Sequence, residues 1–202
     1  MGVTVIGLTG NIGSGKTTLS EMLAKEKQCL CLNADQIGKI VAEPDGAAYA
    51  ALRRNFDARF FLPDGRLNRP KMAELVFNDS AALNLLNSII HPVVLQTLRY
   101  EIDKAYEEAA DRIIVVEAAL LVEANYLGIL DQLWLVWADD DIRLRRVMDR
   151  DKLTAEQALA RMNNQMPQAE KAKLAKFVLH NNGDKDSLRK ELNTIWDKAF
   201  AT

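Results

Sequence analysis

The chain has few of the features that mark secreted or membrane-spanning proteins. Its 202 residues include two cysteines, and no positively charged segment leads into an apolar stretch at the N-terminus. No uninterrupted apolar run approaches the ~18 residues of a membrane span. Cys29 and Cys31 stand two residues apart on a short apolar run, where both side chains share one face of a strand and rarely form a disulfide. We therefore expect a cytoplasmic protein with two small buried thiols.

An excess of charge of either sign is also lacking. The chain has 26 basic and 28 acidic residues, a net charge of -2. Domains that bind the backbone of nucleic acids usually carry a strong basic excess, so we expect no nucleic-acid partner. With 49% hydrophobic residues, a chain of this length can bury one sizeable core and a small insert. Any anion must therefore be bound locally, by a loop or by clustered arginines.

Short apolar, β-branched segments alternate with helical patterns along most of the chain. This alternation predicts a three-layer α/β/α domain with a mainly parallel sheet of about five strands. The candidate strands are residues 3–9, 29–32, 112–117 and 133–137, with a weaker fifth at 177–179.

Residues 36–106 break this alternation. They contain a turn signal at 60–65 and helical patterns around 72–77 and 83–90. The stretch is far longer than the ~2–6 residues of a usual connection, so we interpret it as a helical insert within one domain, 1–202. Between two of its apolar patterns, Pro92 would start a new helix.

The sequence of residues 10–17, Gly-Asn-Ile-Gly-Ser-Gly-Lys-Thr, matches the phosphate-binding pattern G-x-x-x-x-G-K-[ST] at every fixed position. Gly13 and Gly15 allow positive φ angles and close approach of backbone N–H groups to phosphate oxygens. Lys16 would contact the β- and γ-phosphates, and Thr17 would be a ligand of Mg²⁺. So short a pattern can arise by chance, but here it has the strand before it and the helix after it that the function requires. The predicted nucleotide contacts are Gly10, Gly13, Ser14, Gly15, Lys16, Thr17 and Thr18.

Three classes of P-loop protein compete: a small-molecule kinase, a GTPase, and a nucleotide-binding module without transfer. A GTPase needs Asn-Lys-x-Asp for guanine, and no Asn in this chain is followed by Lys. A kinase needs a carboxylate at the acceptor, and Asp35, just after the second candidate strand, is the candidate. Asp35 could instead cap a helix, and the two roles are compatible. Glu117, which ends the third candidate strand, would hold Mg²⁺ through water or cap a helix as a surface carboxylate.

A kinase also needs a cationic lid that neutralises the transferring phosphoryl group and excludes water. Arg143, Arg145, Arg146 and Arg150 lie within eight residues. Such runs usually form a solvated helix face. However, Arg143, Arg146 and Arg150 recur at i, i+3 and i+7 on one face, directly after the fourth strand. We favour a lid over residues 139–166.

Taken together, these residues resemble the dephospho-coenzyme A kinase family from about Val3 to Gly183. The order of D-G-x-L-x-R, H-P and N-N-G is more specific than the loop, which many kinases share. The matching segments are V-I-G-L-T-G-N-I-G-S-G-K-T-T at 5–18, L-N-A-D at 32–35, V-A-E-P at 41–44, L-P-D-G-R-L-N-R at 62–69, I-I-H-P at 89–92, A-L-L-V-E at 119–123, R-R-V-M-D-R-D at 145–151 and N-N-G at 181–183.

The resemblance implies a P-loop kinase fold and transfer of the γ-phosphate of ATP, with Mg²⁺, to the ribose 3′-hydroxyl of dephospho-CoA, the last step of coenzyme A synthesis. It implies that Asp35 is the base or orienting group and that Lys16 and Arg146 stabilise charge. In the family the insert binds the coenzyme. The resemblance thus implies acceptor contacts from Asp35, Arg69, His91 and Glu123, and adenine contacts from Asn181 and Gly183.

Four residues depart from the family pattern. Asn33 replaces a common Asp, Asn11 a common Gly, Ala119 a common Pro and His180 a common Asp. None removes a proposed reacting group, because Asp35 is the acid that matters more. A nucleoside-monophosphate kinase or another small-metabolite kinase on the same fold is the alternative, and the long insert argues against it.

Overall fold

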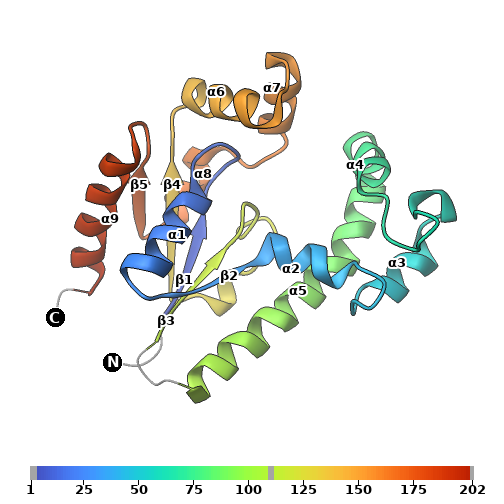
Figure 1. Cartoon of the computed structure of the whole chain (residues 1–202), viewed down its shortest axis with the longest axis horizontal. Coiled ribbons are helices and arrows are strands. Elements are labelled where there is room, and N and C mark those ends of the chain that lie inside the picture. The colour runs from blue at the N-terminus through green and yellow to red at the C-terminus, as the bar shows by residue number, and fades with distance from the viewer. Residues whose placement is uncertain (1–3, 109–111, 201–202) are drawn as a thin grey trace. The chain divides into compact units, whose positions relative to one another are not determined.

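The computed structural model describes residues 4–108 and 112–200 and divides the chain into two compact units. Unit 1 consists of Met1–Asn33 and Lys104–Thr202, and unit 2 consists of Ala34–Asp103 (Figure 1). The first boundary follows directly after a strand, and the second falls inside a long helix.

Unit 1 contains a five-stranded, all-parallel sheet in the order β2-β3-β1-β4-β5, as the alternation of patterns predicted. Because all the strands are parallel, their carboxyl ends meet at one edge. The register places Asn33 beside Glu117 and Trp137 beside His180 at that edge. The strands are β1 Thr4–Thr9, β2 Leu30–Asn33, β3 Ile113–Glu117, β4 Gln132–Trp137 and β5 Phe177–His180.

Both faces of the sheet are covered, which explains the continuous apolar sequence of its central strands. Helices α1 (Lys16–Glu26) and α9 (Lys185–Phe200) pack on one face around the fully buried Trp134. The Trp134 ring meets Phe177 and Trp196 edge to face. On the other face Leu121, Leu130 and Leu133 fill the space that a side chain at Gly7 would occupy.

Three further helices of unit 1 lie between β4 and β5 in the chain: α6 Asp140–Asp151, α7 Ala155–Asn163 and α8 Gln168–Leu174. A reciprocal pair of hydrogen bonds between Thr154 and Gln157 caps the start of α7. Helices α6 and α7 lie beyond the sheet edge that carries the loop between β1 and α1 (Figure 1). A short 3₁₀ helix, η2 Leu127–Ile129, precedes β4.

Unit 2 is helical apart from a turn. Its elements are α2 Ala34–Val41, α3 Tyr49–Asn55, η1 Ala58–Phe60, α4 Arg69–Asn78 and most of α5 Ser80–Glu108. In the turn, Tyr49 donates its hydroxyl to the carbonyl of Gly65 at 2.7 Å. Hydrogen bonds from Arg66 lower the pKa of Asp64. The turn signal at 60–65 is therefore confirmed.

Helix α5 corrects the prediction that Pro92 starts a new helix. It runs for 29 residues with Pro92 in its interior. The carbonyl that loses its helical partner belongs to Ser88, and water can bind it because Ser88 and Pro92 are both exposed. By length and composition alone α5 could cross a membrane, although its apolar residues are interrupted by Asn84, Asn87 and His91. Core helices of water-soluble proteins satisfy the same criterion.

Both cysteines are free thiols, as predicted, and burial raises the pKa of Cys29 to about 12. Because the thiolate is the reactive form, we expect Cys29 in a Cys31→Ser variant to react with Ellman's reagent at pH 8 roughly 10³ times more slowly than an ordinary thiol. In urea the rate should rise to that of an unfolded peptide. A native rate equal to the unfolded rate would contradict the burial of this thiol.

Candidate active site

The loop of residues 10–17 joins β1 to α1, and at two of its positions only glycine fits. Gly13 and Gly15 have φ angles of 82° and 96°, in the left-handed region. A Cβ at Gly15 would collide with the side-chain amide of Asn181. A Cβ at Gly13 would lie 2.7 Å from the carbonyl oxygen of Arg143. The loop therefore needs glycine for its backbone angles and for its close neighbours.

Side chains from two distant segments hold the outside of this loop. The Asn181 amide donates to the Ser14 carbonyl at 2.7 Å. Arg146 on α6 donates to the carbonyls of Asn181 at 2.9 Å, Gly183 at 3.2 Å and Gly13 at 3.5 Å. Arg146 thus joins the phosphate-binding loop to the turn at 181–183.

The four arginines of α6 divide into two pairs. Arg143 is only 4% exposed and donates to the Ile12 carbonyl at 3.3 Å and to Asp140 at 2.7 Å. With Arg146 it contacts the loop. Arg145 and Arg150 are exposed and pair with Asp141 and Asp151, whose pKa values they lower. Arg150 was expected on the same face as Arg143 and Arg146, but in this structure its guanidinium binds its neighbour in sequence.

The residues predicted to bind Mg²⁺ are in contact. Thr17 donates its hydroxyl to Oε1 of Glu117 at 2.9 Å. Glu117 is 5% exposed, so it is not the surface helix cap that the sequence also allowed. Since the Thr17 proton points to Glu117, a lone pair of its oxygen remains for a cation. Lys16 donates to the Gly10 carbonyl at 2.7 Å, across the mouth of the loop.

Metal-binding residues in this site are few. Within residues 4–108 and 112–200, no group of three or more His, Cys, Asp or Glu side chains could hold a metal ion. Mg²⁺ in phosphate-transferring enzymes commonly takes one or two protein ligands, with the rest from phosphates and water. The Thr17 hydroxyl, backed by Glu117, fits that donor set.

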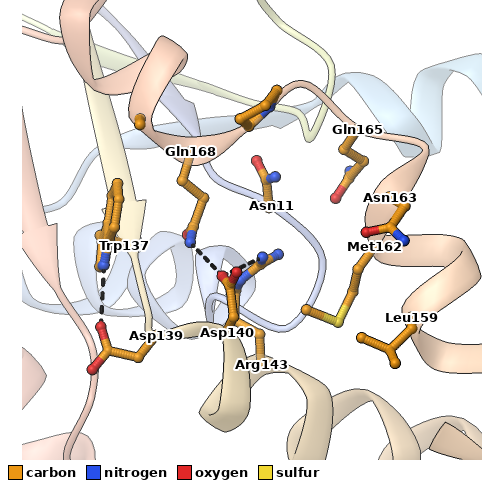
Figure 2. A pocket seen from close by; sticks show the side chains of 12 residues that line it. Asn11, Trp137, Asp139, Asp140, Arg143, Leu159, Met162, Asn163, Gln165 and Gln168 are labelled. Atoms are coloured by element: carbon orange, nitrogen blue, oxygen red, sulfur yellow. Dashed lines mark hydrogen bonds and ion pairs between the residues drawn. The ribbon is translucent and has the colours of Figure 1, made fainter.

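A cavity of about 480 Å³ lies beside the loop, between α6, α7 and the start of α8. Figure 2 shows Asn11 at its centre, with Asp140 joined to both Arg143 and Gln168. Its wall also includes the apolar side chains of Leu159 and Met162. The cavity thus lies mainly against the segment from α7 to α8, with Asn11 as its contribution from the loop.

Glu123 is bound within unit 1. Its Oε1 accepts from the ammonium of Lys171 at 2.9 Å and from the backbone N–H of Met166 at 3.2 Å. Sequence reasoning missed Lys171, which is one of several charged residues in α8. No spacing in that segment separates this buried lysine from its exposed neighbour Lys173.

The remaining predicted residues lie in unit 2. Asp35 is exposed in the first turn of α2. Arg69 donates to the Lys39 carbonyl at 3.0 Å and pairs with Glu43 at 2.6 Å, so it holds the end of α2. Burial lowers the pKa of His91, which favours neutral imidazole at physiological pH.

Helix α2 is also held from α5, which carries His91. Gly38 of α2 faces Ile90 and Val94, each 3.7 Å from the position of an added Cβ. Unit 2 therefore joins the elements that carry Asp35, Arg69 and His91.

The parallel sheet, the glycine loop and the arginine helix bonded to it define a P-loop kinase. The sequence model of one family, described as dephospho-CoA kinase, matches residues 4–187. A relative from Carboxydothermus hydrogenoformans with that name is 37% identical over 96% of this chain and 93% of its own. The chain belongs to the dephospho-CoA kinase family, whose members phosphorylate dephospho-CoA in coenzyme A biosynthesis.

Two solved structures bear on the fold. A crystal structure from Thermus thermophilus has a TM-score of 0.82 at 33% identity and 98% coverage of both chains. Shikimate kinase from Acinetobacter baumannii has a TM-score of 0.54 at 18% identity, over 98% of this chain and 96% of its own. The second likeness concerns the fold alone, and it confirms the P-loop kinase architecture predicted from the sequence.

We expect Gly15→Ala to weaken ATP binding at least tenfold and to destabilise unit 1 by ~1–3 kcal/mol, the cost of a strained backbone position. Its φ is 96°, and the new Cβ would displace Asn181. The checks are titration with a fluorescent ATP analogue and thermal unfolding. Gly128→Ala is the matched control, since nothing lies within 4 Å of its added Cβ. Normal ATP affinity in Gly15→Ala would contradict the role assigned to this loop.

Proposed function

We propose that this chain transfers the γ-phosphoryl group of Mg-ATP to the ribose 3′-hydroxyl of dephospho-CoA. The observation that carries the proposal is the arrangement at the carboxyl edge of the sheet. There the Thr17–Glu117 pair adjoins the phosphate-binding loop, and Asn33, two residues before Asp35, lies in register with Glu117. Ligands of open α/β sheets bind at this edge.

On the ATP side, backbone N–H groups of residues 10–17 other than those of Ile12 and Ser14, which already donate to Gln165 and Asn11, would bind the β- and γ-phosphates. Lys16 and Arg146 would neutralise charge that develops during transfer. Mg²⁺, held by the Thr17 hydroxyl and through water by Glu117, would supply further positive charge between the phosphates. Asn181 and Gly183 would lie by the adenine. Arg143, which already supports the loop from α6, fits a lid over 139–166.

On the acceptor side, Asp35 would accept a hydrogen bond from the 3′-hydroxyl and orient it for attack. Chain connectivity supports this role, because two peptide links keep the Cα atoms of Asn33 and Asp35 within about 7.6 Å of each other. The insert, 36–106, would bind the coenzyme, with Arg69 and His91 near the acceptor. The bonds of Arg69 to the Lys39 carbonyl and to Glu43, which hold the end of α2, fit that role. We also propose that the enzyme is cytoplasmic and that it binds neither nucleic acid nor a membrane.

The direct test measures ADP release from ATP with dephospho-CoA, AMP, CMP or gluconate as acceptor, with and without EDTA. We expect stimulation by dephospho-CoA alone and its loss when Mg²⁺ is removed. Phosphate NMR of the product should show a 3′-monophosphate. Lys16→Ala serves as the inactive control. Stimulation by AMP or CMP instead would favour the nucleoside-monophosphate kinase alternative, and no stimulation with ATP still bound would favour a module without transfer.

Asp35→Asn should lower kcat by a factor of ~10²–10⁴ and leave ATP affinity unchanged, because the carboxylate acts on the acceptor. Asp57→Asn is the matched control. Asp57 is an exposed acid of unit 2 that caps η1 by accepting from the N–H of Arg59 at 2.9 Å. Helix α2 begins at Ala34, so Asp35 lies inside its first turn and is not the helix cap that the sequence also allowed. A near-normal kcat in Asp35→Asn would contradict its role at the acceptor.

A further inference from the structure

Lys171 on α8 is a cation without access to solvent. Its side chain is 0% exposed, and its ammonium donates to the Ala119 carbonyl at 2.7 Å and to Glu123 at 2.9 Å. Only the lysine is enclosed, because the Glu123 side chain is 23% exposed. Burying one charge of an ion pair is costly, and a well-packed apolar side chain of similar volume often gives equal or greater stability. Such a pair can instead fix the positions of the groups that are hydrogen-bonded to it.

Those groups lead to the phosphate-binding loop. Oε1 of Glu123 also accepts the N–H of Met166 at 3.2 Å, and the carbonyl of Met166 accepts the side-chain amide of Asn11 at 2.9 Å. Next to it in sequence, Oε1 of Gln165 accepts the N–H of Ile12 at 2.7 Å. Residues 165 and 166 thus bind two consecutive residues of the loop, and Glu123 in turn binds the backbone N–H of residue 166.

A second route passes through Ala119. Its carbonyl, which accepts from Lys171, lies 3.4 Å from the hydroxyl of Thr9, the residue that ends β1 just before the loop. Thr9 is fully buried, and Asn11 is 2% exposed. Because Thr9 and Asn11 are shielded from water, their hydrogen bonds are not readily exchanged for bonds to water, and we expect a displacement of the Lys171–Glu123 pair to reach the loop.

We propose that Lys171 and Glu123 form a positioning pair that holds residues 9–12 in the conformation that binds the phosphates of ATP. Glu123 therefore acts on the nucleotide side and is not an acceptor contact. The proposal rests on the loop binding ATP. The proposal does not depend on which acceptor the enzyme uses, because the test measures affinity for the nucleotide.

The first test is the Lys171→Met variant, which replaces the lysine with an apolar side chain of similar length. We expect the Kd of a fluorescent ATP analogue and the KM for ATP to rise roughly 10–100-fold, the scale of effects from small misplacement of a binding group. The KM for dephospho-CoA should stay within about twofold. Lys173→Met is the matched control on the same helix, where an exposed ammonium pairs with Glu170 at 2.7 Å. It should leave all three constants unchanged.

The second test separates positioning from stability. Lys171→Met alone leaves Glu123 without its cation, whereas the double variant Lys171→Met/Glu123→Gln removes both charges. We expect the double variant to recover most of the Tm that Lys171→Met alone loses. Its Kd for the ATP analogue, measured well below that Tm, should stay raised. Glu123→Gln alone should also raise the Kd for the ATP analogue, so the proposal stays testable if Lys171→Met does not fold.

Three results would overturn the proposal. The first is an unchanged nucleotide affinity in folded Lys171→Met. The second is a double variant in which nucleotide affinity returns together with the Tm. The third is a Glu123→Gln variant in which only the KM for dephospho-CoA rises. The last would make Glu123 an acceptor contact. If the wild-type enzyme phosphorylated another acceptor, the proposed function would fail while the affinity measurements still tested the pair.

Discussion

Each of the five consecutive carbonyl groups from Gly10 to Ser14 accepts a hydrogen bond, and the nucleotide site depends on these bonds. The donors, in loop order, are Lys16, the N–H of Ser14, Arg143, Arg146 and Asn181. When the carbonyls of a loop are held by such bonds, the N–H groups that make no other bond can converge on an anion. Three of the five donors are cations, so the same contacts that shape the loop also surround it with positive charge.

This arrangement explains why α6 and the turn at 181–183 are bonded to each other as well as to the loop. Arg146 alone reaches Gly13, Asn181 and Gly183. A lid that is hinged separately from the loop would lose these bonds when it moved. Arg145 and Arg150, whose partners Asp141 and Asp151 both lie on α6, are the arginines of that helix that could change partners without disturbing the loop.

Much of the fold could be predicted because it depends on local sequence patterns. Continuous apolar segments such as 113–117 indicate strands buried on both faces, and the glycine loop between a strand and a helix indicates phosphate binding. Thr17 and Glu117 could be paired in advance, since parallel strands bring their carboxyl ends together. The extension of α5 through Pro92 could not be predicted, because it depends on the exposure of one carbonyl to water.

The positioning pair could not be predicted for a different reason. In sequence, Lys171 and Lys173 are equivalent members of one charged helix, yet the first is fully buried and the second is mostly exposed. The difference arises because Lys171 faces Ala119 and Glu123, which are distant in sequence, and no local pattern records these contacts. The proposed acceptor residues are a further case. The sequence places Asp35 just after the second strand, and Arg69 and His91 in the insert, but their roles depend on the substrate they meet.

The departures from the family pattern are consistent with this arrangement. Asn33 pairs in register with Glu117 on the neighbouring strand, where an aspartate would add a second negative charge beside the buried carboxylate. At position 119 the bonds to Lys171 and Thr9 are made by the backbone carbonyl, so alanine in place of proline leaves both acceptor bonds intact. His180 stacks at a tilt against Trp137, with ring centroids 6.3 Å apart, and joins the ends of β4 and β5 just before Asn181. At these three positions the contacts that shape the loop come from other groups. At the fourth, Asn11, the replaced side chain itself makes such a contact, with the carbonyl of Met166.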